Sequence, residues 1–213
     1  MRILIVLLSI SFVACGQQTK KYVINPKAKL LADSAYKFVR TNLGDTASLQ
    51  SAIKLLKQAT EIDSNYILGF RNTLSYQMIL KDYSGALVTA KRMSDLRPQN
   101  ADFFSTLGIT YELNSDTISS KPNFQKAVDI YSKVLDTLSD QKAISSVKSS
   151  KAINLLFLNH YQEGQAIIKE LIQSSKDSIE VEGLKLYLNK TGHEIILMFL
   201  NGEETQSVSP SQQ

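Results

Sequence analysis

The chain has 213 residues, of which 43% are hydrophobic and 21% charged, and its formal net charge is +4. This composition excludes an intrinsically disordered chain and leaves room for one core. Charges alternate in sign along the sequence, so the chain lacks the concentrated basic face that a nucleic-acid binder needs. Nine glycines and four prolines are too few for a turn-rich sandwich or barrel, and we predict an all-α fold.

The first fourteen residues have the pattern of an export signal. Arg2 supplies a positive charge, and a short apolar run follows from Ile3 to Val13. That run is shorter than the roughly 20 residues needed to span a bilayer. The alternative is a buried N-terminal helix, but a wholly polar stretch from Gly16 to Lys21 follows directly. We therefore expect residues 1–14 to be a signal peptide.

Cys15 is the only cysteine, so no intrachain disulfide can form. With Ala14 before it and Gly16 after it, Cys15 resembles the lipobox cysteine of bacterial lipoproteins, although Phe12 stands where leucine is most common. The resemblance implies cleavage before Cys15, diacylation of its sulfur and acylation of the new amine. Two or three acyl chains anchor a protein firmly, whereas one chain binds only marginally. The alternative is a free buried thiol.

Residues 15–29 are then expected to be the lipidated cysteine and a flexible tether. Pro26 and the polar composition argue against a helix there. No acidic residue directly follows Cys15, and some bacterial groups use such residues to send lipoproteins to the cell surface. The expected location is therefore the cell envelope, on the outer membrane and facing the periplasm.

A period of about 34 residues organises the rest of the chain. When the segment Ile67–Asn100 is aligned with the segment that begins at Ala101, residues of one size recur at fixed places. Small residues fall at one such place in each unit. The positions that carry the pattern are Ala52, Phe70, Ala86, Pro98, Phe104, Gly108, Tyr111, Ala127, Tyr131 and Gly164.

This pattern resembles the tetratricopeptide repeat, in which two antiparallel helices pack closely because a small side chain lies at their crossing. The resemblance implies that Ala52, Ala86, Ala127 and Gly164 lie at those crossings. It further implies an α-solenoid of about four helix-turn-helix repeats plus a C-terminal capping helix, within residues 30–202. The alternative is a non-repetitive helical bundle with the same amphipathic spacing.

The four units begin at Asp33, Ile67, Ala101 and about Ser145, and Tyr36 takes the place of the large residue near the start of the first. The third unit carries extra residues, which we place in its turn as an insertion, Asn114–Asn123. Such a loop is either functional or a tolerated extension. Ser178–Lys190 is predicted to be the capping helix. Residues 193–200 form a short apolar run, helix or strand, and residues 203–213 a polar, disordered tail.

No sequence motif indicates catalysis, a metal site or a cofactor. His193-Glu194 begins like a zinc-protease helix, but Leu197 stands where the second histidine must be. A metal site needs at least three ligands, and His160 is the only other histidine. We therefore expect a protein that is not an enzyme, with no metal and no cofactor.

In the family that the chain resembles, the first helix of each pair lines a concave groove. Carried over to this sequence, the resemblance implies a partner-binding groove formed by Lys37, Thr41, Arg71, Ser75, Met78, Asp102, Ser105, Ile109, Glu112, Ser149, Ile153 and Leu156. One version of the family grips a peptide carboxylate, but Thr41, Asp102 and Thr106 occupy places where that version needs other residues. An extended peptide or a partner helix would fit the groove.

The expected function is a lipid-anchored scaffold or adaptor that mediates protein–protein interactions in the bacterial cell envelope. Its partners would be a protein or peptide and, through the lipid, the membrane, with no nucleic acid. The alternative is a glycan or small-ligand binding lipoprotein of a nutrient-uptake system. The absence of tryptophan counts against this alternative, because sugars are bound by stacking on aromatic side chains.

Overall fold

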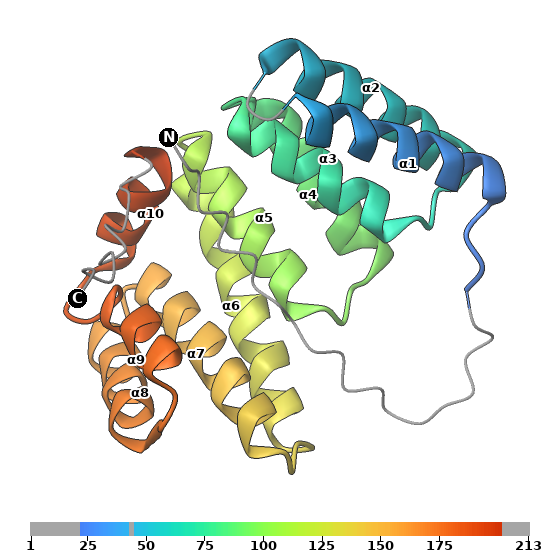
Figure 1. Ribbon diagram of the computed structural model, residues 1–213. Helices are drawn as coiled ribbons and strands as arrows, with labels where there is room; N and C mark the ends of the chain where they lie inside the picture. Colours follow the sequence, from blue (N-terminus) through green and yellow to red (C-terminus); the bar gives the residue numbers. More distant parts are fainter. Residues whose placement is uncertain (1–21, 43–44, 202–213) are drawn as a thin grey trace, which may run out of the picture. The chain divides into compact units, whose positions relative to one another are not determined.

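The computed structural model describes residues 22–42 and 45–201, and within these ranges it contains ten helices and no strand (Figure 1). The signal peptide, Cys15 and the tail 203–213 lie outside the described residues. The helices are α1 (Pro26–Thr41), α2 (Thr46–Ile62), α3 (Ile67–Ile79), α4 (Tyr83–Leu96), α5 (Ala101–Leu113), α6 (Thr117–Leu135), α7 (Gln141–Phe157), α8 (Tyr161–Ser174), α9 (Ser178–Lys185) and α10 (Gly192–Asn201). The predicted all-α fold class is confirmed.

The chain divides into two compact units, whose described parts are residues 22–130 and 131–201, so the boundary falls inside α6. In the first unit α1 packs on α2, α2 on α3, α3 on α4 and α4 on α5. In the second, α7 packs on α8, α8 on α9, and α10 on α7. Successive helical hairpins are therefore present, as the resemblance implied, and α9, shorter than the predicted capping helix Ser178–Lys190, follows the fourth hairpin.

Three hairpins share one turn. Lys81, Ser115 and Asn159 each adopt a left-handed conformation, with φ of 56°, 62° and 65°. The N–H of the residue after each of them donates to a carbonyl five residues earlier, at 2.8, 2.9 and 2.8 Å. This is the Schellman closure of a helix C-terminus. The turns therefore have the same length in the second, third and fourth hairpins.

The predicted insertion Asn114–Asn123 is consequently wrong. Residues 117–123 are the first turns of α6, which continues through Pro122. The starts of α4 at Tyr83 and of α6 at Thr117 are one repeat period apart, so Ser120 and not Ala127 corresponds to Ala86. Ser120 is small and 0% exposed, and it therefore suits the crossing as well as alanine does. The extra residues lie at the end of α6, in 136–140 and in the first turn of α7.

Helix α1 begins within the segment predicted to be tether. Pro26 occupies the first helical position, where its missing N–H costs nothing because that group has no partner inside the helix. The side chain of Asn25 caps the helix by accepting from the Lys27 N–H at 3.0 Å. The buried face of α1 consists of Ala28, Ala32 and Ala35. Tyr36 is 59% exposed, so the large residue at this place of the first unit does not lie in the core.

Small residues lie where helices approach closely. A Cβ on Gly108 of α5 would be 2.5 Å from the ring of Phe124 in α6, and one on Gly164 of α8 would be 2.8 Å from Leu156 in α7. The third and fourth hairpins are closed by these glycine contacts, since larger side chains would force the helices apart. Ala52 and Ala86, expected at the crossings of the first two hairpins, are each 0% exposed.

The C-terminal segment is fixed by one buried glutamine. The amide nitrogen of Gln165, in α8, donates to the carbonyls of Tyr187 and Lys190 at 3.0 and 3.1 Å, and its oxygen accepts from the Asn189 N–H at 2.9 Å. Helix α10 then begins with a capping box in which Thr191 and Glu194 bond reciprocally. The apolar run 193–200 is thus helical, and Ile195 and Ile196 of α10 are buried.

Candidate partner-binding surface

The residues predicted to line the groove on α3 and α5 have matching environments. Arg71, Ser75 and Met78 of α3 are each half-buried, and so are the residues one repeat period later on α5. We call this set the first-helix surface: Arg71, Ser75, Met78, Ser105, Ile109 and Glu112. Its members flank the buried faces of their helices, so they are accessible and yet held in place by packing.

Glu112 differs from the other members because its carboxylate is engaged within the hairpin. It accepts a hydrogen bond from the Thr117 hydroxyl at 3.3 Å and a short one from the Ser120 hydroxyl. Glu112 therefore ties α5 to the start of α6. The sequence could not indicate this role, since both hydroxyls lie in the segment that the sequence placed in a loop.

On α1, Lys37 and Thr41 are exposed, and the helical period places them opposite the buried alanines. Two other residues of α1 lie near tyrosines of the neighbouring elements: Tyr36 near Tyr76 of α3, and Asp33 near Tyr66 just ahead of α3. Burial raises the pKa of Tyr76, and the nearby Tyr36 raises it further. Burial likewise raises the pKa of Tyr66, with a further contribution from Asp33.

On α7, Ser149 and Ile153 are half-buried, but Leu156 is 1% exposed. Leu156 lies against Gly164 of α8, and its backbone lies against Gly192 at the start of α10. The groove assignment of Leu156 is therefore wrong, because this residue belongs to the core of the second unit.

The residues expected to shape the repeats have varied surroundings. Phe104 and Tyr131 are buried, and the Lys126 ammonium lies 4.1 Å from the centre of the Phe104 ring. Phe70 and Tyr111 are half-buried. Pro98 is exposed, next to the residue that caps the end of α4. Pro98 therefore ends a helix and contributes nothing to the core.

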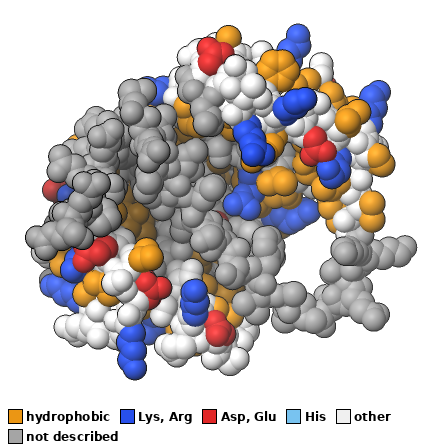
Figure 2. Space-filling view, viewed as in Figure 1, with side chains coloured by type: hydrophobic (Ala, Val, Ile, Leu, Met, Phe, Trp, Pro, Cys, Tyr) orange, Lys and Arg blue, Asp and Glu red, His pale blue; other side chains and the backbone are white. Residues whose placement is uncertain are grey.

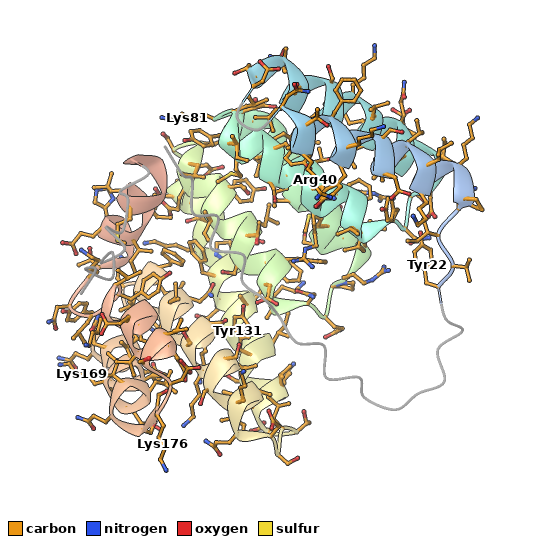
Figure 3. All side chains as sticks on the ribbon, viewed as in Figure 1. Tyr22, Arg40, Lys81, Tyr131, Lys169 and Lys176 are labelled. Carbon is orange, nitrogen blue, oxygen red and sulfur yellow. The ribbon has the colours of Figure 1, made fainter. Side chains whose placement is uncertain are left out.

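The segment ahead of α1 is attached to the turn between α2 and α3. The two carboxylate oxygens of Asp63 accept from the N–H groups of Asn25 and Asn65, at 2.9 and 3.2 Å. Burial and the hydrogen bond to Asp63 raise the pKa of Tyr22 to about 12. Burial alone would raise the pKa of Asp63, but its hydrogen bonds outweigh burial and lower it. Figure 3 shows Tyr22 beside the N-terminal end of α1, with Arg40 toward the other end.

Within the described ranges, no three His, Cys, Asp or Glu side chains converge as metal ligands. No helix in the described part of the chain combines the length and apolarity needed to cross a membrane. A shallow hollow runs along α2 between Gln50 and Glu61, but its lining comes from that one helix.

The solved structures to which this chain is similar include two described as follows. No family model and no curated protein matches the chain. Among solved structures, MamA residues 41 to the end, from Desulfovibrio magneticus RS-1, is 14% identical, with a TM-score of 0.42 over 73% of this chain and 100% of that one. YrrB, described as a TPR protein with an unusual peptide-binding site, is 15% identical, with a TM-score of 0.43 over 80% of this chain and 91% of that one.

Proposed function

We propose that this chain is a lipid-anchored adaptor of the bacterial cell envelope, which binds a protein partner through its first-helix surface. The observation that supports this most is the recurrence of half-buried side chains on α3 and α5 at equivalent places of successive repeats. An elongated partner segment could meet equivalent positions on successive hairpins. The surface combines Arg71 and Met78, residue types enriched in protein interfaces, with Ser75, Ser105 and Ile109.

Site-specific photo-crosslinking in the native cell tests the binding surface. A photoreactive residue at Met78 or Ile109 should give a discrete crosslinked protein band. The matched control is Val88 on α4, which is 72% exposed and lies outside the first-helix surface, and crosslinking there should give no such band. Equal bands from all three positions, or bands from none, would contradict the proposed surface.

Lipid anchoring is supported by the sequence around Cys15 and needs its own measurement. Cells that express the full chain should incorporate labelled palmitate into it, and the Cys15→Ser variant should not. After a high-salt wash, which weakens contacts between basic side chains and lipid, the Cys15→Ser variant should also leave the membrane fraction. Unchanged labelling of this variant, or unchanged fractionation after the high-salt wash, would rule out the anchor.

A further inference from the structure

One side of α1 is exposed and partly apolar. Leu30 is 67% exposed and Phe38 48%, and Val23, just ahead of the helix, is 81% exposed. The helical period places Lys27, Leu30, Ser34, Lys37, Phe38 and Thr41 on the side away from the buried alanines, and we call this set the outer face of α1. Figure 2 shows hydrophobic and basic side chains intermingled in the upper right, where α1 lies in Figure 1.

The hydroxyl groups of this face are already satisfied by its own backbone. Ser34 donates to the Leu30 carbonyl at 2.9 Å, and Thr41 donates to the Lys37 carbonyl at 2.8 Å. Neither hydroxyl then needs a donor bond to water. Ser34 and Thr41 are the only uncharged polar residues of the outer face. Moving them out of water therefore costs little free energy, because their hydroxyl groups keep a hydrogen-bond acceptor.

The charges of α1 are strongly one-sided. Its sixteen residues include four basic side chains and a single acidic one. The acidic residue, Asp33, pairs with Lys29 at 2.6 Å. Lys27, Lys37 and Arg40 form no ion pair with any residue in the described ranges. Terminal repeats of helical arrays normally have a polar outer side, whereas α1 combines apolar and cationic groups there, as helices at anionic membrane surfaces do.

The position of α1 along the chain identifies the occupant. Cys15 lies only seven positions before Tyr22, and this stretch spans at most about 25 Å when fully extended. The Asp63 contact attaches the segment from Tyr22 to Asn25 to the first hairpin. This segment therefore does not lengthen the connection between Cys15 and the hairpin. If Cys15 carries lipid, as the proposed function has it, α1 stays close to the bilayer surface.

We propose that the outer face of α1 docks on an anionic lipid bilayer as a second membrane contact beside the lipid anchor. Leu30, Phe38 and Val23 enter the headgroup region, while the ammonium groups of Lys27 and Lys37 meet lipid phosphates. A single acyl chain holds a protein only marginally, and a basic surface commonly supplies the second contact. The contact orients the first hairpin on the membrane. This proposal rests on the proposed lipid anchor for bringing α1 close to a membrane, but the affinity of the outer face for anionic lipid does not depend on the anchor.

Vesicle co-sedimentation without any acyl chain tests the contact. The protein is residues 15–213 with Cys15→Ser, which removes the apolar signal and the lipidation site but none of the described residues. It should bind phosphatidylcholine vesicles that contain phosphatidylglycerol, and binding should weaken with added salt. The double variant Leu30→Ser/Phe38→Ser should lose at least about tenfold in affinity for these vesicles. The control Val88→Ser/Ile118→Ser removes side chains that are 72% and 88% exposed on other helices and should bind like the parent.

Three results would overturn the proposal. The first is a parent protein without affinity for anionic vesicles at any salt concentration, and the second is an equal loss of binding in both double variants. The third is a dimer, seen by light scattering, that only Leu30→Ser/Phe38→Ser dissociates, without vesicle binding; the outer face would then be an interface between two copies. Circular dichroism melting checks that each variant is folded. Palmitate labelling of the full chain tests the anchor separately.

Discussion

Two helical glycines have opposite surroundings. A Cβ at Gly108 would lie 2.5 Å from the Phe124 ring, which is itself fully buried, whereas a Cβ at Gly183 of α9 meets nothing within 4 Å. Gly108→Ala should therefore lower the free energy of unfolding by about 1–3 kcal/mol. Gly183→Ala should raise it by up to about 1 kcal/mol, because alanine has less chain entropy to lose. Urea denaturation measures both, and stabilisation by Gly108→Ala would show that the ring can move aside.

Asp63 uses both carboxylate oxygens, so Asp63→Asn leaves one N–H without an acceptor. We expect the free energy of unfolding to fall by about 1 kcal/mol. Trypsin should also cleave faster at Lys27, because the segment ahead of α1 detaches. The pKa of Asp63 is lowered from its ordinary value of 3.8. The stability that the Asp63 carboxylate contributes to the folded protein is therefore fully present above that value. It is lost as the pH falls through the lowered pKa of Asp63 in the folded state. Asp95→Asn, on the exposed side of α4, should change neither the cleavage nor its pH dependence.

At single positions, the sequence predicted where small residues allow helices to pack closely better than it predicted side-chain hydrogen bonds. The close approach at Gly164 could be located from spacing, because close helix crossings exclude large side chains whatever surrounds them. The bonds from Thr117 and Ser120 to Glu112 could not, since they depend on where α6 begins. The Asp63 contact joins residues 38 positions apart, a distance over which no local pattern operates.

The shared hairpin turn forces a residue with a side chain into a left-handed conformation. At Ser115, with φ of 62°, this costs free energy that glycine would not incur. Ser115→Gly should therefore raise the free energy of unfolding by roughly 0.5–1 kcal/mol. The matched control is Ser51→Gly on the exposed side of α2, which should lower it by about as much. If both changes destabilise the protein, the Ser115 turn does not have this conformation in solution.

Helix ends were less predictable than helix positions. Pro26 both follows a polar stretch and opens α1, and composition alone cannot distinguish the end of a tether from a first helical turn. Residues 117–123 look like a loop because they are serine-rich and contain Pro122, but the Asp116 carboxylate caps them by accepting from the Ser119 N–H at 3.0 Å. In both places a side-chain cap decides the boundary, and single sequences indicate caps only weakly.

The repeat period breaks at the point where the chain divides into two compact units. Helices α3 and α5 begin one period apart, at Ile67 and Ala101, but α7 begins only at Gln141. The division lies between Ile130 and Tyr131, just before the extra residues. The sequence indicated that the third unit was longer but not that its extra residues mark a boundary, because an insertion can be placed anywhere between two matched positions.

Each unit should therefore respond to its own destabilising change. Gly108→Ala should speed amide hydrogen exchange mainly in residues 22–130, and Gly164→Ala, whose Cβ would lie 2.8 Å from Leu156, mainly in residues 131–201. Exchange measured by mass spectrometry on peptic peptides resolves the two. Equal acceleration throughout the described residues by either variant would mean that the chain unfolds as one cooperative body.

The hydrogen bonds of Gln165 also constrain the order in which the protein can be completed during synthesis. A chain emerges from its N-terminal end, and its parts begin to fold as they appear. The Gln165 amide of α8 is buried in the complete protein, and the three backbone groups that satisfy it belong to residues 187–190. The amide consequently lacks all three of these partners until Lys190 has emerged. A chain that stops between α8 and that residue should be a target for proteases, whereas an extension after α10 leaves this step untouched.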